Sequence, residues 1–156
     1  MTSWGNSSIE GDGAPPVAAN VKADRLFGGH GGVVAVRNGR IAEWGRALVF
    51  TGVNFDPTSL SDVREVAFGA SSSACVMSVG GDVSCWGWNE FGQPGVPSTD
   101  TCIGVSGAGS CAQRPIRLPL AGRAVHIAGN CAVLENADVW CWRRAGLARV
   151  ANFARP

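Results

Sequence analysis

Residues 75–95 read CVMSVGGDVSCWGWNEFGQPG, and this stretch decides the fold. Two short runs of strand-forming residues flank Gly80 and Gly81, a pair that favours a tight hairpin turn. A tryptophan stands at the end of the second run. The same order of strand, turn, strand and tryptophan returns at residues 33–45 and at residues 131–142. The chain is therefore predicted to consist of a repeated β-hairpin.

The tryptophans set the period of this repeat. Trp4 and Trp44 are 40 residues apart, Trp44 and Trp86 are 42 apart, and Trp86 and Trp142 are 56 apart. The last spacing is a period of ~40 residues that carries an insertion at residues 96–113. About four short strands in such a period are typical of one β-propeller blade. We expect an all-β fold, a partial β-propeller of about three to four blades.

The whole chain, residues 1–156, is interpreted as a single repeat domain. Each period begins with a proline-containing segment, which we expect at the outer edge of a blade because proline has no backbone N–H to donate. The expected divisions are residues 1–45 for the first repeat, 46–87 for the second, 88–142 for the third with the inserted loop 96–113, and 143–156 for the start of a further blade.

The cysteines indicate disulfide bonds. Cys75 and Cys85 lie symmetrically about one hairpin turn, and Cys131 and Cys141 lie symmetrically about another. Residues placed in this way face each other across two strands, with Cα atoms ~4.5 Å apart in a non-hydrogen-bonded pair. That distance is at the short end of the range for a disulfide. The remaining two cysteines, which are able to close a Gly- and Ser-rich loop, are Cys102 and Cys111.

Two alternatives to this pairing stay open, namely reduced structural cysteines and a metal site. A zinc site needs about four converging ligands, usually from closely spaced cysteine pairs. No two cysteines here are closer than nine positions, and neither His30 nor His126 accompanies a pair at ligand spacing. Disulfides favour an oxidising compartment, whether secreted, periplasmic or an organelle lumen. No signal peptide is visible in the first twenty residues.

Composition excludes several classes of function. The net charge of the 156 residues is +1 and the isoelectric point is about 7.6, so nothing points to nucleic acid. No apolar run approaches the ~20 residues of a membrane span. The glycine-rich stretch around His30 lacks the helix start and the lysine of a phosphate loop. Acidic residues are scattered singly, so we expect no catalytic residues, no bound metal, no cofactor and no enzymatic activity.

Residues 75–95 resemble the repeat of the regulator of chromosome condensation family. The resemblance extends over nearly the whole chain as about three degenerate repeats of a cysteine-bearing type, and it is most specific in the middle repeat. It implies a ring of about seven blades that presents loops to protein partners, as in nucleotide-exchange factors and a proteinaceous β-lactamase inhibitor. The residues that match the family pattern are Trp86, Gly87, Asn89, Gly92, Gln93 and Gly95.

The flanking repeats depart from this pattern, and three repeats do not complete a ring. Trp44 is followed by residues 46–50 in place of the Asn and Gly-Gln elements, and Trp142 is followed by two arginines. An open arc of blades exposes strands and faces that invite association. We expect protein partners, either in a large complex on which the chain docks or through self-association that completes a ring.

The function expected from the sequence is a non-enzymatic protein-interaction or scaffold module. Trp44, Trp86 and Trp142 recur with the scaffold, so we expect them to pack inside it. The insertion at residues 96–113 is either a surface decoration or a pre-ordered binding loop. The alternative function is an oligomeric β-propeller lectin that binds glycans through exposed tryptophans. The candidate partner-binding residues are Trp88, Asn89, Glu90, Phe91, Gln93 and Trp140.

Overall fold

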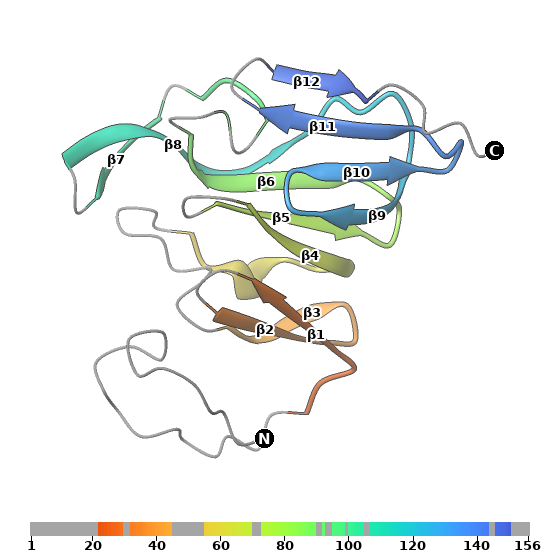
Figure 1. The fold of residues 1–156 in the computed structure, drawn as a ribbon. Helices are drawn as coiled ribbons and strands as arrows, with labels where there is room; N and C mark the ends of the chain where they lie inside the picture. Colours follow the sequence, from red (N-terminus) through yellow and green to blue (C-terminus); the bar gives the residue numbers. More distant parts are fainter. Residues whose placement is uncertain are drawn as a thin grey trace.

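Three antiparallel β-sheets follow one another along the chain and lie side by side in space (Figure 1). The computed structural model describes residues 22–29, 32–44, 55–69, 73–89, 92, 95–98, 100–104, 107–143 and 146–150. Each sheet is built around one of the hairpins that the sequence predicts.

The first sheet has the order β1 (Arg25–Gly29), β2 (Gly32–Arg37), β3 (Arg40–Trp44). Its hairpin turn consists of Asn38 and Gly39, whose φ angles are +49° and +69°. Both central residues of a type I′ turn need a positive φ, which glycine and asparagine adopt most readily. The Asn-Gly pair therefore fixes the register of this hairpin.

The second sheet has the order β4-β5-β6-β8-β7 and is preceded by a 3₁₀ helix, η2 (Pro57–Ser59). Its hairpin joins β5 (Ser73–Ser78) to β6 (Val83–Trp88), and β4 (Val63–Gly69) lies beside β5. The two outer strands, β7 (Asp100–Gly104) and β8 (Gly107–Arg117), come from the stretch between the second and third tryptophan repeats.

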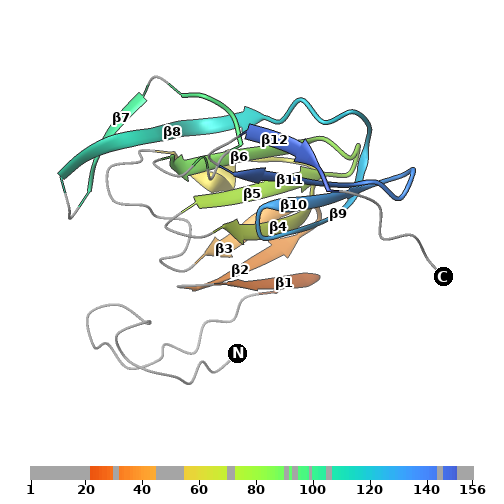
Figure 2. The same ribbon diagram turned by 45° about the horizontal axis from the view of Figure 1, so that its top comes forward.

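The third sheet has the order β12-β11-β10-β9. Its strands are β9 (Ala124–Ala128), β10 (Cys131–Leu134), β11 (Val139–Arg143) and β12 (Gly146–Arg149). At the opposite edge from β12, strand β9 contacts β4, and β4 in turn contacts β1. The three sheets therefore converge along the edge formed by their first strands, as blades do around a propeller axis (Figures 1 and 2).

Two segments lie elsewhere than the tryptophan spacing suggests. The insertion, expected as a loop of the third repeat, forms β7 and the first part of β8 at the edge of the second sheet. Residues 146–149, expected to open a further blade, pair with β11 inside the third sheet. Pro115 lies in the part of β8 beyond the end of β7, where the register with β6 is irregular. A proline is tolerated there because no ladder hydrogen bond needs its N–H.

The core fills the two spaces between neighbouring sheets. One buried cluster joins the first sheet to the second and contains Val36 and Trp86; the other joins the second to the third and contains Met77 and Trp142. Both tryptophans are completely buried, as their repetition predicts. Phe55, from the segment before η2, packs edge-on against Trp86 with ring centroids 5.5 Å apart. The side chain of Trp44 lies outside the described residues.

The six cysteines pair as the sequence predicts, two pairs by their hairpin spacing and the third as the remaining pair. Cys75–Cys85 and Cys131–Cys141 each join residues directly opposite in a hairpin, with Cα atoms 4.0 Å apart. The third bridge, Cys102–Cys111, joins β7 to β8 across a diagonal, since Cys111 is opposite Asp100, and its Cα atoms are 5.8 Å apart. Every sheet but the first therefore carries a covalent bridge among the described residues.

Candidate protein-binding site

Two of the sequence-predicted partner-binding residues, Trp88 and Asn89, lie where β6 ends. Trp88 is half-buried and stands opposite Cys111 of β8. The backbone N–H of Asn89 donates to the carbonyl of Ser110 at 2.9 Å. The end of β6 is thereby attached to the base of the β7–β8 hairpin.

The Asn89 side chain closes the segment that follows β6. Its Nδ2 donates to the carbonyl of Val96 at 3.1 Å, while its buried Oδ1 has no hydrogen-bond partner among the described residues. Gly95, with φ +73°, lies against the third sheet, where an added Cβ would come within 2.7 Å of Trp142 Cγ. Only glycine fits this approach without a shift. The Asn and Gly of the sequence motif therefore join the second sheet to the third.

The other candidates do not gather around Trp88 in the part of the chain that the structure describes. Glu90, Phe91 and Gln93 lie outside the described residues, as does His30. Trp140 belongs to the third sheet, opposite Ala132 on β10, and packs against the buried cluster between the second and third sheets. Its ring is half-buried, so it is chiefly a core residue.

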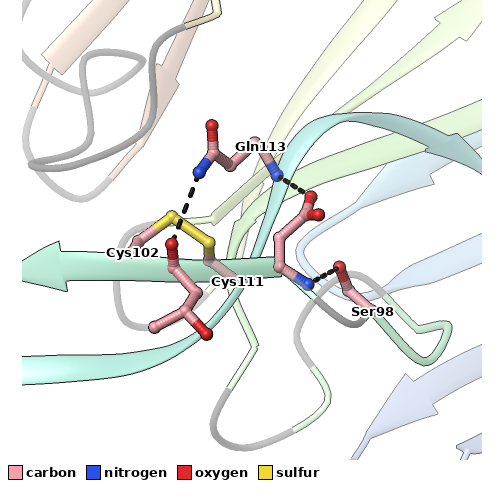
Figure 3. The surroundings of a disulfide bond; sticks show 6 residues. Ser98, Cys102, Cys111 and Gln113 are labelled. Atoms are coloured by element: carbon pink, nitrogen blue, oxygen red, sulfur yellow. Dashed lines mark hydrogen bonds between the residues drawn. A yellow bond between two sulfur atoms is a disulfide. The ribbon is translucent and has the colours of Figure 1, made fainter.

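The β7–β8 hairpin is an ordered arm at the edge of the second sheet (Figures 1 and 2). Around its disulfide, the backbone N–H of Gln113 donates to Asp100 Oδ2 at 3.0 Å, and Gln113 Nε2 donates to the carbonyl of Thr101 at 3.4 Å (Figure 3). The backbone N–H of Asp100 donates to Ser98 Oγ at 3.2 Å. Cys102 and Cys111 are themselves buried. These contacts hold the two strands of the arm together.

Ile103 is the residue that sequence reasoning missed. It follows the buried Cys102 on β7, and 73% of it is exposed, the largest fraction among the exposed large hydrophobic residues of the described chain. Alternation along a strand explains the contrast, because neighbouring side chains point to opposite faces. In the sequence, Ile103 is one of several β-branched residues of the insertion, which also contains Thr99, Thr101 and Val105. The sequence predicts a loop here, so nothing in it marks Ile103 as an exposed residue of a strand.

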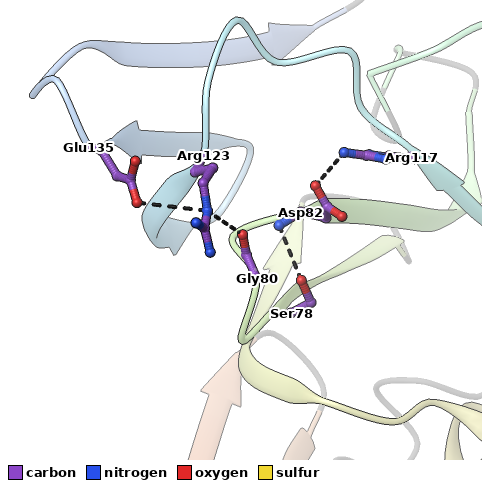
Figure 4. Close-up of polar contacts among 6 residues, drawn as sticks. All are labelled: Ser78, Gly80, Asp82, Arg117, Arg123 and Glu135. Atoms are coloured by element: carbon purple, nitrogen blue, oxygen red, sulfur yellow. Dashed lines mark hydrogen bonds and ion pairs between the residues drawn. The ribbon is translucent and has the colours of Figure 1, made fainter.

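Charged residues at the hairpin turns serve the scaffold. Asp82 pairs with Arg117 of β8, and its backbone N–H donates to Ser78 Oγ at 3.1 Å (Figure 4). The equivalent pair in the third sheet is Asp138–Arg149, at 2.6 Å. Each pair fastens an outer strand to the turn of its own sheet, so these charges have a structural role.

Among the described residues, one titratable group has a pKa that departs clearly from its ordinary value. The pKa of Asp56 is lowered, because the Thr58 hydroxyl and the Thr58 backbone N–H both donate to its carboxylate, at 2.7 Å and 2.9 Å. This arrangement caps the N-terminus of η2, so the lowered pKa of Asp56 has a structural cause. Among the described residues, no group of three His, Cys, Asp or Glu side chains is placed to hold a metal ion.

A search for membrane spans among the described residues finds no helix with the length and apolarity that a crossing requires. No curated protein matches the sequence.

Residues 63–93 match the family described as Regulator of chromosome condensation (RCC1) repeat. Among solved structures, the chain is similar to Prp20p from Saccharomyces cerevisiae, with 16% identity and a TM-score of 0.51 over 80% of this chain and 35% of that one. It is also similar to yeast RCC1 (Prp20) in complex with Kap60, with 16% identity and a TM-score of 0.47 over 72% of this chain and 28% of that one. The chain thus spans about a third of the length of these structures.

The matched residues run from β4 through the hairpin of the second sheet to the Gly-Gln element, which is the repeat with the most complete sequence motif. The similarity to Prp20p concerns the arrangement of the sheets. By sequence in its middle repeat and by fold over most of its length, the chain resembles the regulator of chromosome condensation repeat family, and its fold is a partial β-propeller.

Proposed function

We propose that this protein is a non-enzymatic protein-interaction module that docks in a larger assembly through the β7–β8 arm and the adjoining Trp88–Asn89 segment. The observation that carries the proposal is Ile103, a large apolar side chain that is 73% exposed on a strand anchored by a disulfide. A pre-ordered apolar side chain loses little conformational freedom on binding, so more of its burial contributes to affinity. The adjoining Trp88 offers a second, aromatic contact of the kind that dominates interfaces.

The class of partner is a protein. Prp20p, whose fold this chain shares, is described together with its binding to Gsp1p and histones. A propeller scaffold supports binding of this kind by holding loops and arms on rigid sheets. Only the class of ligand, a protein, is carried over from Prp20p to this chain. The chain matches the family motif in one repeat, and its arm is an insertion of its own.

The proposal includes an oxidising compartment. Three disulfides account for all six cysteines of the chain, and such bonds persist where thiols are not kept reduced. Because Cys102–Cys111 orders the arm itself, reduction is expected to weaken partner binding along with the scaffold.

Affinity capture from the natural source tests the docking surface. The wild-type chain and two variants, Ile103→Arg and Val79→Arg, serve as baits under non-reducing conditions. Val79 is the matched control, since it is also an exposed apolar residue but lies in the β5–β6 turn. We expect a partner to be retained by the wild type and by Val79→Arg and to be lost from Ile103→Arg. Equal capture by all three baits would place the interface elsewhere, and glycan binding that Trp88→Ala abolishes would favour the lectin.

A further inference from the structure

Successive sheets contact one another through equivalent residues, and these residues can be identified from the strand register. In each sheet, one residue of the second strand lies between a residue of the first strand and a residue of the third. These triplets are Arg25–Val36–Ile41, Glu65–Met77–Val83 and His126–Val133–Val139. The first residues of the three triplets are therefore structurally equivalent, as are the second and the third residues. Differences in burial between equivalent residues show how the first and third sheets differ from the second.

The face of each sheet that points toward the next sheet, here called the forward face, is apolar on its second and third strands and carries a polar residue on its first strand, namely Arg25, Glu65 or His126. In the first sheet Val36 and Ile41 are buried against the second, and in the second sheet Met77 and Val83 are buried against the third. The forward face of the third sheet consists of Val133, Val139 and the disulfide Cys131–Cys141, and all four residues are only partly buried. It therefore retains the apolar surface that the other two forward faces cover.

The opposite face of each sheet, here called the rear face, shows the same contrast at the other end. Leu26, Val66 and Ile127 each follow the first residue of a triplet, and their exposed fractions are 49%, 5% and 4%. Phe27 packs toward the second sheet, so strand alternation directs Leu26 to the opposite side. Val33, on the same side, is also exposed. The rear face of the first sheet thus carries the exposed Leu26 and Val33 and, opposite Leu26, the buried Ala35.

Backbone hydrogen bonds between sheets also repeat. The carbonyl of Gly39 accepts from the N–H of Val63 at 2.8 Å, and the carbonyl of Gly81 accepts from the N–H of Ala124 at 2.9 Å. Ala137 occupies this position in the third hairpin, with a φ of +67° close to that of Gly39. No described residue donates to its carbonyl. The carbonyl of Ala137 is therefore a free acceptor among the described residues, whereas the equivalent carbonyls of the two earlier turns each accept a hydrogen bond from the next sheet.

The first sheet carries the matching donor. Val63 and Ala124 stand two positions before the first residue of their triplets, and Ala23 stands two positions before Arg25. The residue before Ala124 is Arg123, whose Nε donates to the carbonyl of Gly80 at 2.7 Å (Figure 4). The residue before Ala23 is Lys22, another exposed cation. Lys22 and Ala23 are thus placed to donate hydrogen bonds to the carbonyls of a hairpin turn, as Arg123 and Ala124 do at the start of the third sheet.

We propose that the forward face of the third sheet binds the rear face of the first sheet in a second copy of this chain, so that copies join head to tail. The occupant is a second copy because both halves of the interface are already present on one chain and continue the pattern of its two internal interfaces. Lys22 and Ala23 of that copy would meet the carbonyls of Asn136 and Ala137. This contact is separate from the β7–β8 arm.

Ala137 sets how closely the second copy approaches. A Cβ at Gly81 would lie 2.8 Å from the carbonyl oxygen of Ala124, whereas a Cβ at Gly39 would have Asp62 Cα as its nearest neighbour, at 3.4 Å. An alanine therefore fits the looser spacing of the first interface but not that of the second. The second copy docks with the looser spacing, and the affinity is correspondingly limited.

Sedimentation of the oxidised 156-residue chain tests the proposal. We expect mass above the 16.1 kDa of one chain, increasing with concentration up to about 100 μM. Val133→Arg on the forward face and Leu26→Arg on the rear face each place an unpaired charge in the interface, so each is expected to weaken association roughly thirtyfold or more. Ile103→Arg is the control, since it changes the arm and leaves both faces intact. A wild-type chain that stays at one-chain mass at that concentration overturns the proposal.

Mixing the two variants distinguishes a head-to-tail contact from a symmetric one. Val133→Arg keeps an intact rear face and Leu26→Arg keeps an intact forward face, so an equimolar mixture should form a heterodimer and nothing larger. Two variants that stay monomeric when mixed, although each is folded by circular dichroism, contradict the proposal. So does a Leu26→Arg chain that self-associates like the wild type, because this result would indicate contact between two forward faces.

Ala137→Gly is expected to strengthen association, a result that a misfolded variant would not produce. Removal of the Cβ permits the closer spacing of the second interface, so we expect association to tighten by roughly threefold to tenfold. An unchanged or weaker association would count against the Ala137 contact. The two proposals fail separately, because Ile103→Arg is expected to lose partner capture and retain self-association, and Val133→Arg is expected to do the reverse.

Discussion

Gly39 and Gly81 hold the same place in successive turns, but the space around them differs. Both have a positive φ, yet an added Cβ meets Ala124 O at 2.8 Å in one case and Asp62 Cα at 3.4 Å in the other. We expect Gly81→Ala to lower the free energy of unfolding by about 2–4 kcal/mol and Gly39→Ala by about 1–2 kcal/mol, which is the cost of the left-handed backbone alone. Urea unfolding of both variants measures the difference, and equal losses would show that crowding at Gly81 is relieved by a small shift of the third sheet.

Some residue positions were predictable from the sequence and others were not. The cysteine pairs and the burial of Trp86 and Trp142 follow from their repetition at fixed distances from a turn. Trp140 is half-buried because it is opposite Ala132, on the same face of the sheet as the buried Trp142. Its place two residues before Trp142 already indicates this in the sequence, since residues two apart along a strand share a face.

At the scale of elements, two disulfides with the same hairpin geometry differ in their surroundings. Cys75 and Cys85 are buried between the second and third sheets, whereas Cys131 and Cys141 lie on a face that is only partly covered. Thiol–disulfide exchange requires access of the attacking thiolate to a sulfur. We therefore expect dithiothreitol to reduce Cys131–Cys141 at least tenfold faster than Cys75–Cys85, as followed by alkylation and mass spectrometry. Equal rates would mean that the molecule opens globally before either bond reacts.

The β7–β8 arm shows where prediction from the sequence ends. The insertion is rich in glycine and serine and lacks sustained alternation of apolar and polar residues, so nothing in it predicts strands. Its structure depends on non-local contacts, chiefly the pairing of β8 with β6 and the Cys102–Cys111 bridge. The exposure of Ile103 follows from that pairing and could not be obtained from the local sequence.

At the scale of the whole molecule, stability is divided between two interfaces. Each cluster joins one pair of neighbouring sheets, and arrays of this kind gain stability mainly from such contacts. Trp142→Ala should cost about 3–5 kcal/mol and reduce hydrogen-exchange protection in β9–β12 more than in β1–β3. Trp86→Ala is the matched variant, with the larger loss expected in β1–β3. A uniform loss of protection in both variants would show that the sheets unfold as one cooperative unit.

The position of β8 in the second sheet has a consequence for how such a chain can lengthen by duplication. Ile116 and Arg117 of β8 pair with β6, yet they stand only a few residues before β9, the first strand of the third sheet. The segment from Trp86 to Trp142 therefore completes the sheet behind it and begins the sheet ahead. Duplication of one such segment in a gene would add a whole sheet and leave no neighbour without its outer strand. The offset between the repeat in the sequence and the sheet in space lets the array lengthen in single, self-sufficient steps.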